Sequence, residues 1–531
     1  MDSIQKNRVL WGAPLLFIGV LFYLPLARIL SLGLSGEWLT SIWTPHVLSI
    51  FWFTIWQAGI SAAACIALGI PGAYLFYTRK FRGQHLVKAF ITVPFVLPTI
   101  VVAIGFTSFR KISLFTSILQ GGSYIPIILL ANIFMNYSIA VRIIGSTWSN
   151  LDPSVEDAAA LDGAGRFRTF TSVTLPNLRG SIASAGALIF LYCAASFGLV
   201  LVLGGGKIKT VETEIYLNAT QYLDLRKTSG LVLLQTIITV IAFLLSRNRG
   251  ENGLGESQSG GLHRRVDIRD LPAVILTFAF ISLVIALPIL KIFDEAFTFA
   301  GRLSLQNFAN LTGKGARDLL NISVTQAAFN SIRNTIIASI LSIFIGVLVS
   351  YLISRKYGSS LNQKFRSLLD FAFQAPVGIS TVVLGFGYLI TFTTGLFPLR
   401  SSWLATPLVA SLIATPLVIR LVYPALTSLN RELLESASTE GASDGSIWME
   451  IEAPIIRNVL LTALGFSALI SIGEFGAANF LAYGDQATLP IILFQLISRP
   501  GRQNYGMAMA ASAILILFVA VIIYLVTRVE D

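Results

Sequence analysis

The chain has 531 residues, of which 54% are hydrophobic and 12% are charged, and its mean hydropathy is +0.75. A soluble globular domain carries about twice this charged fraction. The apolar residues gather into blocks of roughly 18 to 25, the length that crosses a hydrocarbon core about 30 Å thick. The composition predicts an all-α polytopic membrane protein and excludes a soluble enzyme, a disordered protein and a secreted disulfide scaffold.

The formal net charge of +11 has a topological explanation. Lys and Arg stand in small groups between the apolar blocks, without the basic stripe or the basic and aromatic alternation typical of nucleic-acid binding. Their bias toward one side of the predicted membrane places both termini in the cytoplasm. Cys65 and Cys193 fall inside apolar blocks, so we expect buried apolar fillers there and no disulfide or metal site.

Twelve spans are predicted along the chain, six in each half. Lys6 and Arg8 precede the first span, which is too long for a signal peptide and lacks a small-residue cleavage site, so we interpret it as retained. The spans of the first half are expected at 10–30, 51–77, 86–108, 124–146, 182–203 and 229–245, and those of the second half at 271–291, 328–353, 367–392, 403–423, 459–480 and 507–527.

A segment rich in Gly, Ser and charge separates the two halves. We therefore predict a first six-span repeat at 1–245, a flexible cytosolic linker at 246–270 and a second six-span repeat at 271–531. A mobile linker of about 24 residues spans roughly 25 to 30 Å, which is enough to join two helical bundles. A regulatory role of this segment is the alternative.

The two halves are an internal repeat with an offset of about 278 residues. Equivalent pairs include Arg142 and Arg420, Gly163 and Gly441, and Pro176 and Pro454, and a single gap keeps the earlier parts aligned. Because an even number of spans returns the chain to its starting side, the halves share one orientation. Two parallel six-helix repeats with a pathway at their interface are the expected architecture.

A cytosolic loop after the fourth span of each half carries the strongest motif. Asp152 suits a helix N-cap with Pro153 at the first helical position, and Gly163 permits a left-handed helix end. Asn430 and Gly441 take the same places in the second copy. Each copy is predicted to form two short helices.

Two features of the loop would let another protein approach it. Small residues at 158–160 leave the backbone close to the surface. Phe170, with Trp448 at the equivalent position, offers an aromatic plug for a partner's groove.

The loop resembles the signature of the membrane-spanning subunits of binding-protein-dependent ABC importers. That signature reads Glu-Ala-Ala, three residues, Gly, nine residues, Ile, any residue, Leu-Pro. The matching residues are Asp157-Ala158-Ala159, Gly163, Val173 and Leu175-Pro176 in the first copy, and Glu435-Ser436-Ala437, Gly441, Ile451 and Ala453-Pro454 in the second. The spacing is kept in both copies. Asp157, Ser436 and Ala453 depart from the pattern, so the second loop is expected to dock somewhat differently.

The resemblance implies the fold of a type I ABC importer permease in a bacterial plasma membrane, with each loop forming a coupling helix. Two copies of a separate ATPase subunit would bind the loops, and an extracytoplasmic binding protein would deliver the solute. The chain itself would be no enzyme and hold no cofactor, and ATP would be used by the partner. In agreement, Gly206-Lys207-Ile208 does not complete a phosphate-binding loop.

The fused architecture looks most like the thiamine and ferric-iron permeases. Gly204-Gly205-Gly206, followed by Thr210, Glu212 and Glu214, looks nearer to the thiamine branch. Thiamine is therefore the expected substrate, and ferric iron or another small solute is the alternative.

Glu474 is the one carboxylate predicted well inside a span, where a charge costs on the order of 2.5 to 3.5 kcal/mol. One reading places it on the pathway of a cationic ligand. The other has it protonated or hydrogen-bonded, capping a helix break beside Gly473 and Gly476. Its repeat partner is Ser196, so no carboxylate pair is expected.

The remaining signals are weaker. His46, His85 and His263 lie in different loops, so no metal site is predicted. The segment 293–325 is expected as the largest outside loop, either a dock for the binding protein or a partly buried lid. The main rival function is an ion-coupled secondary transporter, which would need more buried ionisable residues. A membrane-embedded enzyme would need a catalytic constellation that the sequence does not offer.

Overall fold

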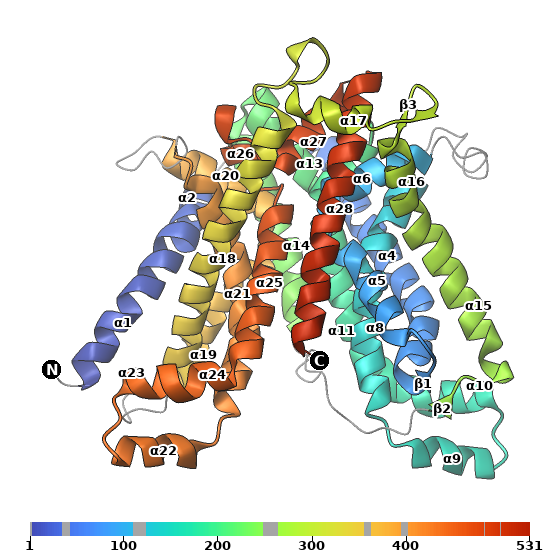
Figure 1. Cartoon of the computed structure of the whole chain (residues 1–531), viewed down its shortest axis with the longest axis vertical. Coiled ribbons are helices and arrows are strands. Elements are labelled where there is room, and N and C mark those ends of the chain that lie inside the picture. Colours follow the sequence, from blue (N-terminus) through green and yellow to red (C-terminus); the bar gives the residue numbers. More distant parts are fainter. Residues whose placement is uncertain are drawn as a thin grey trace. The chain divides into compact units, whose positions relative to one another are not determined.

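The computed structural model describes residues 3–33, 43–109, 124–247, 264–354, 363–393, 402–482, 484–499 and 501–530. Its architecture is helical, with two short two-stranded pairings (Figure 1). The chain packs as two compact units, 1–35 with 312–492 and 515–531, and 36–311 with 493–514. We call them unit 1 and unit 2. In the labels below, η marks 3-10 and π-helical turns.

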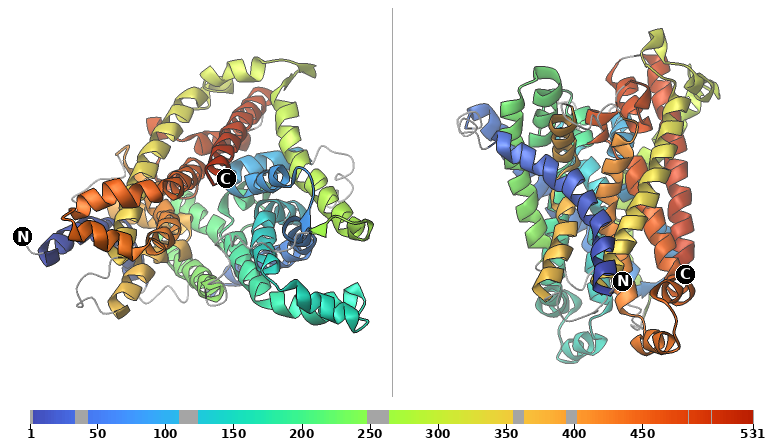
Figure 2. Two further views of the ribbon diagram at one scale, coloured as in Figure 1. Left: turned by 60° about the horizontal axis from the view of Figure 1, so that its bottom comes forward. Right: turned by 90° about the vertical axis from the view of Figure 1, so that its left-hand side faces the viewer.

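Unit 1 joins the N-terminal helices to most of the second half of the chain. Its elements are α1 (Ser3–Ile18), η1 (Gly19–Tyr23), α2 (Leu24–Gly33), η8 (Ala316–Asp318), α18 (Val324–Ser354), α19 (Gln363–Gln374), η9 (Ala375–Gly378), α20 (Thr381–Phe392), α21 (Ala405–Thr427), α22 (Arg431–Thr439), α23 (Asp444–Ile447), η11 (Trp448–Glu452), α24 (Ala453–Ile455), α25 (Arg457–Gly473), α26 (Ala478–Leu481) and η12 (Gly484–Gln486). Both chain termini lie toward the end of this unit that carries α22 (Figure 2).

Unit 2 holds the rest of the first half and the start of the second. Its elements are α4 (Pro45–Thr78), β1 (Arg79–Lys80), α5 (Gln84–Val96), α6 (Thr99–Ser108), α8 (Ile125–Ser149), α9 (Pro153–Leu161), α10 (Arg166–Thr169), η3 (Phe170–Thr174), α11 (Leu175–Ala194), α12 (Phe197–Leu203), α13 (Val211–Leu217), η4 (Asn218–Tyr222), α14 (Leu225–Arg247), β2 (Arg264–Arg265), η5 (Ile268–Asp270), α15 (Leu271–Phe280), η6 (Ile281–Ala286), α16 (Leu287–Ala296), β3 (Thr298–Phe299), β4 (Arg302–Leu303) and α17 (Gln306–Ala309). Three elements extend across the division between the units: η7 (Asn310–Thr312), α27 (Leu489–Ser498) and α28 (Arg502–Glu530).

The strand pairings are short. β1 and β2 are parallel, with Arg79 opposite Arg264. β3 and β4 are antiparallel, with Phe299 opposite Arg302, and they form a hairpin within the predicted outside loop. The role of that loop as a dock or a lid stays a prediction.

The structure gives eight to twelve candidate spans where twelve were predicted. Eight helices of the described residues are long and apolar enough to cross a membrane, and four bent pairs bring the number to twelve if each pair is one span. Three spans expected as continuous helices are instead bent: 86–108 by 101°, 182–203 by 51° and 367–392 by 98°. The bend at Leu97 has a direct cause, because Pro98 pushes the preceding residue into an extended conformation.

The two units group the first span of each half with helices of the other half. In unit 1, Gly387 of α20 receives Pro25 and Ile29 of α2, whose side chains lie 3.0 Å from where a Cβ would stand. In unit 2, Gly105 of α6 receives Ile292 of α16 at the same distance. A Cβ at either glycine would be in tight contact with these side chains, which would have to shift by a few tenths of an ångström. The division predicted at 1–245, 246–270 and 271–531 follows the duplication of the sequence and stays a prediction.

Four π-helical turns share one cause, a proline two residues after the turn. The turns η1, η3, η6 and η11 end at residues 23, 174, 286 and 452, and prolines follow at 25, 176, 288 and 454. A proline inside a helix removes one hydrogen bond and its ring clashes with the carbonyl four residues earlier. A π turn widens the helix at that point and relieves the clash.

Candidate functional site

The first cytosolic loop folds as its sequence predicts. The Asp152 carboxylate accepts a hydrogen bond from the Ser154 backbone N–H at 2.9 Å, and Pro153 begins α9. That N–H lowers the pKa of the Asp152 carboxyl. At the other end Gly163 has φ +82°, and its N–H donates to the Ala160 carbonyl at 3.1 Å. The bond from Ala164 N–H to Ala159 O, at 3.0 Å, completes a Schellman motif.

The second loop repeats this backbone bond for bond. Asn430 Oδ1 accepts from the Glu432 backbone N–H at 3.0 Å, and Gly441 has φ +89°. Its closing bonds run from Gly441 to Ser438 at 3.1 Å and from Ala442 to Ala437 at 3.0 Å. No atom lies within 4 Å of a Cβ built on Gly163 or Gly441. Both positions therefore require glycine for its backbone conformation and not for space.

The signature residues show the same exposure in both loops. Asp157 and Glu435 are exposed, whereas Ala159 and Ala437 are half-buried. After the turn, η3 and η11 lead into the exposed Pro176 and Pro454. The two loops thus share their helix starts, their helix ends and their π turns.

The two predicted aromatic plugs are half-buried within the chain. Phe170 stacks on Trp148, with ring centroids 5.9 Å apart, and Trp148 in turn meets Tyr74 at 5.5 Å. Trp448 packs edge-on against Tyr351 at 5.6 Å. These contacts seat the loops on the helices above them, and the docking role of both rings stays a prediction.

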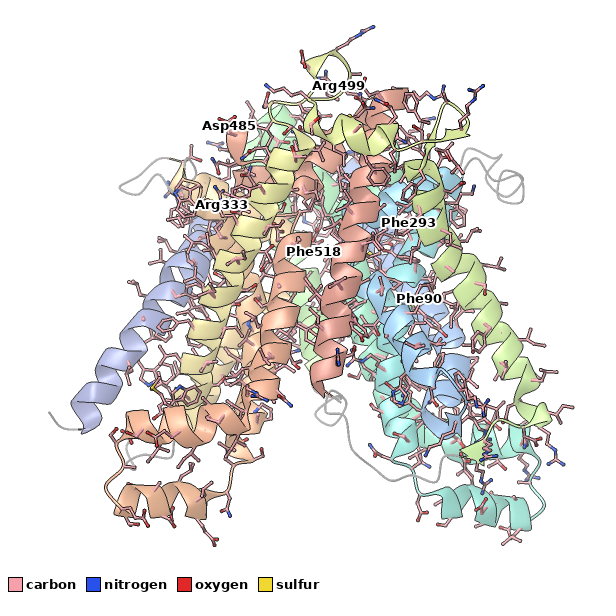
Figure 3. The ribbon with its side chains drawn as sticks, in the orientation of Figure 1. Phe90, Phe293, Arg333, Asp485, Arg499 and Phe518 are labelled. Atoms are coloured by element: carbon pink, nitrogen blue, oxygen red, sulfur yellow. The ribbon has the colours of Figure 1, made fainter. Side chains whose placement is uncertain are left out.

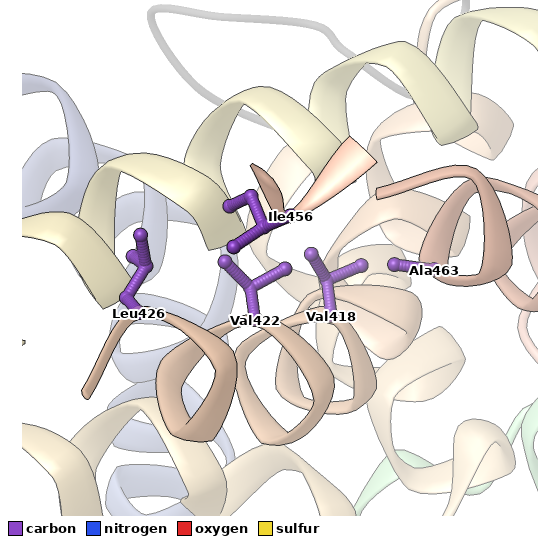
Figure 4. Packing of buried hydrophobic residues seen from close by; sticks show 5 residues of the cluster. All are labelled: Val418, Val422, Leu426, Ile456 and Ala463. Carbon is purple, nitrogen blue, oxygen red and sulfur yellow. The ribbon is translucent and has the colours of Figure 1, made fainter. Parts of the chain in front are cut away.

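A buried apolar cluster lies behind the second loop. Val422 and Leu426 of α21 meet Ile456 and Ala463, and Trp448 packs against them (Figure 4). The loop is thereby fixed to α21 and α25 by apolar burial.

Other apolar side chains of the loops face outward. Leu161 is 90% exposed, Phe167 is 81% exposed and Met449 is 75% exposed. Val155 and Leu433, at equivalent positions of α9 and α22, are exposed as well. An apolar surface of this kind on a short helix is typical of a contact site for another protein.

The first loop also carries an ion pair that the sequence did not reveal. Arg264 Nη2 donates to both carboxylate oxygens of Asp157, at 2.9 and 3.1 Å. The pair raises the pKa of Arg264. Because the partners are 107 residues apart in the chain, no local pattern could have found it.

Glu474 lies at a helix break, as the second reading of the sequence expected. It is buried and follows α25 directly, and its carboxylate oxygens accept the backbone N–H groups of Ala477 at 2.9 Å and Ala478 at 2.8 Å. The carboxylate therefore satisfies donors at the start of α26. A contact with the transported solute stays a prediction.

The glycine motif after the fifth span has a structural role. Gly205 and Gly206 have φ +58° and +73°, and a Cβ on Gly204 would lie 2.5 Å from the Ile208 carbonyl oxygen. The turn leads to Thr210, whose side chain and that of Thr213 form a capping box at the start of α13.

Glu214 of α13 is buried beside two lysines and a histidine. Lys209 Nζ lies 3.1 Å and Lys227 Nζ 3.7 Å from its carboxylate, and His46 Nε2 lies 3.4 Å away. Burial raises the pKa of Glu214, but the bonds from Lys209 and Asn218 outweigh it and leave the pKa below its usual value. The contacts with Lys209 and Lys227 therefore account for the burial of Glu214, and no substrate is needed to explain it.

A second charged group is satisfied at the opposite end of unit 1 from α22. Arg333 of α18 donates to Gln486 Oε1 at 2.8 Å and lies over the ring of Trp403 at 5.2 Å (Figure 3). Its charge is thus matched within the unit.

Among the described residues, no group of three or more His, Cys, Asp or Glu side chains could hold a metal ion. Cys65 and Cys193 are buried. His263 lies outside the described residues.

Residues 66–249 and 342–531 match the family of binding-protein-dependent transport system inner membrane components. The chain belongs to this family. The two matches identify a fused permease with two repeats of one domain, as the sequence predicted, and the helical fold agrees with an ABC importer permease.

Individual relatives fall on two branches. The thiamine transport system permease protein of Brucella suis is 24% identical, over 88% of this chain and 86% of that protein. The corresponding thiamine permease of Escherichia coli is 24% identical, over 93% and 90%. The ferric transport system permease protein of Actinobacillus pleuropneumoniae is 25% identical, over 98% of this chain and 78% of that protein. The permease is thus similar to both branches at nearly equal identity.

Proposed function

We propose that the permease couples ATP hydrolysis by two copies of a separate ATPase subunit to solute import, with α9 and α22 each seated in one copy. The observation that carries this proposal is the pair of loops with one backbone geometry and exposed apolar side chains. The capped helix and its left-handed end occur at two places 278 residues apart. Two loops of the same geometry could each bind one copy of the same partner.

In this account the chain is a transport subunit and not an enzyme. The ATPase pair closes and moves the coupling loops, and the membrane helices turn the pathway outward. A docked extracytoplasmic binding protein then releases its solute. The termini lie toward the end of unit 1 that carries α22, which supports a cytoplasmic location for both.

Thiamine is the proposed solute, and ferric iron is the second candidate. The thiamine relatives and the glycine motif before α13 support the first. The ferric relative, which covers 98% of this chain, supports the second. Selectivity in such a system is expected to depend on the binding protein, which is a separate chain.

Uptake into cells that lack their own importers tests the function and the solute together. Radiolabelled thiamine and ferric iron would be offered to cells expressing the permease with its ATPase and its binding protein. ATP-dependent thiamine uptake supports the full proposal. ATP-dependent iron uptake supports the importer function but identifies ferric iron as the solute. Uptake that follows an ion gradient without ATP would favour a secondary transporter.

A further inference from the structure

The segment that precedes α15 lies against the first coupling loop. Arg264 and Arg265 form β2, which pairs with β1 at the end of α4. Asp267 then caps η5, and Asp270 precedes α15 directly. Within unit 2, this short stretch therefore meets the end of one predicted span and begins another.

Asp270 is the centre of the contact. Its side chain is 1% exposed. Tyr74 O–H donates to its Oδ1 at 2.7 Å, Arg79 Nε donates to its Oδ2 at 2.8 Å, and the Asp267 N–H donates to the same oxygen at 3.0 Å. Arg79 also hydrogen-bonds to the Tyr74 hydroxyl and lies 4.6 Å from its ring centroid. A buried carboxylate is costly unless its charge and lone pairs are matched, and here both are.

The same acid reaches the coupling loop. Arg166, the first residue of α10, places Nη1 3.6 Å from Asp270 Oδ1. The pair Arg264 and Asp157 adds a tie to α9. Both helices of the first loop are thus linked to the segment that precedes α15.

The second loop reverses one of these charges and keeps the other. Asp444 stands where the first loop has Arg166, and Glu435 stands where it has Asp157. Neither forms an ion pair with another residue of the described chain. An acid at 444 could not bind a carboxylate as Arg166 does.

We propose that Asp270 is a positioning residue that fixes the first coupling loop to the start of α15. The proposal rests on the proposed function and deepens it. Motion imposed on α9 and α10 by an ATPase subunit is then transmitted to α15 through Asp270, Arg79 and Arg166. Among the described residues, no ion pair ties the second loop in this way.

The test uses Arg166→Glu, which places a second negative charge beside Asp270. Arg168→Glu is the matched control, because Arg168 is exposed on the same helix and forms no ion pair with the described residues. Arg166→Lys is the conservative rescue. The permease would be purified with its ATPase and binding protein, and solute taken up per ATP hydrolysed would be measured in vesicles. We expect a loss of roughly fivefold or more for Arg166→Glu, with both other variants close to the parent.

Hydrogen exchange at the backbone amides of Asp267 and Ile268 gives a readout that needs no ATPase. Faster exchange in Arg166→Glu than in Arg168→Glu supports the contact between Arg166 and Asp270. This comparison remains valid even if the ATPase subunit dissociates from the Arg166→Glu variant. Equal transport per ATP and equal exchange in the two variants would overturn the inference while leaving the importer intact. A parent permease that transports without any ATPase would overturn the proposed function itself.

Discussion

The two coupling loops share a backbone and differ in what holds it. Both have a polar N-cap, a glycine with positive φ, a π turn and a proline at the same places. In the first loop, Trp148 separates Phe170 from Tyr74, and charges join the loop to the start of α15. In the second, a single tryptophan packs on Tyr351 beside an apolar cluster. Duplication has thus kept the groups that fix chain direction, while the groups that attach each loop have diverged.

The shared backbone predicts the largest effect. Gly163→Val with Gly441→Val forces a β-branched residue into a left-handed conformation at both helix ends, which costs on the order of 1 to 3 kcal/mol at each site. We expect both helices to lose their geometry and the permease to lose its ATPase on purification. Gly165→Val is the control, because Gly165 has φ −66° and an extended conformation that valine adopts. Retention of the ATPase by the double variant would refute the role of these turns.

The next largest effect is a difference in stability loss between alanine variants of Glu474 and of its repeat partner Ser196. Glu474→Ala removes the acceptor of two buried backbone N–H groups, and we expect a loss of about 2 kcal/mol or more in stability. Ser196 Oγ is buried without a hydrogen bond among the described residues, so Ser196→Ala should change stability by about 0.5 kcal/mol or less. The stabilities of Glu474→Ala and Ser196→Ala would be compared by their thermal unfolding midpoints in detergent. Equal midpoints would show that the helix break does not depend on the carboxylate.

A ring exchange tests the divergent packing. Leu426 occupies the position equivalent to Trp148, so Leu426→Trp with Trp448→Phe gives the second loop the tryptophan and phenylalanine of the first loop at equivalent positions. Leu426→Trp alone should overpack the cluster and cost about 1 to 3 kcal/mol. The double variant should recover part of that loss, again by thermal unfolding. No recovery would mean that the two seats are not interchangeable.

The smallest expected effect is a difference in pH response between the two caps. The pKa of Asp152 is lowered in the folded loop, so its cap is fully present above the ordinary Asp pKa of about 3.9 and is lost as pH falls through the lowered value. Asn430 does not titrate. Amide exchange should therefore quicken on acidification at Ser154 and stay unchanged at Glu432, after correction for the intrinsic pH dependence of exchange. Parallel behaviour of the two amides would contradict this account of the caps.

Much of the fold was predictable because local signals specify it. Apolar block lengths located the spans, and Asp152, Gly163 and their repeat partners marked the loop helices, since caps and left-handed ends depend on neighbouring residues. Of the two bends near 100°, only the one at Leu97 had such a signal, Pro98. The break at Ile379 has no proline directly behind it.

The attachments of the first loop could not be predicted. Arg79 and Asp270 are 191 residues apart, and their meeting depends on α15 packing against α4. The ring contacts of Phe170 with Trp148 and of Trp448 with Tyr351 could not be predicted either, because a sequence does not show which rings meet inside the chain. Contacts of this kind depend on tertiary packing. The repeated loop motif indicates the backbone of each loop but not its long-range contacts.

Each of the two equivalent loops is proposed to hold one ATPase subunit. The most direct measurement is the stoichiometry of the permease purified from its native membrane in mild detergent, by mass spectrometry of the intact complex and of its components. Two copies of one ATPase for each permease chain are predicted. A permease that carries no ATPase under several gentle conditions, and that imports solute into liposomes on an ion gradient, would contradict the account.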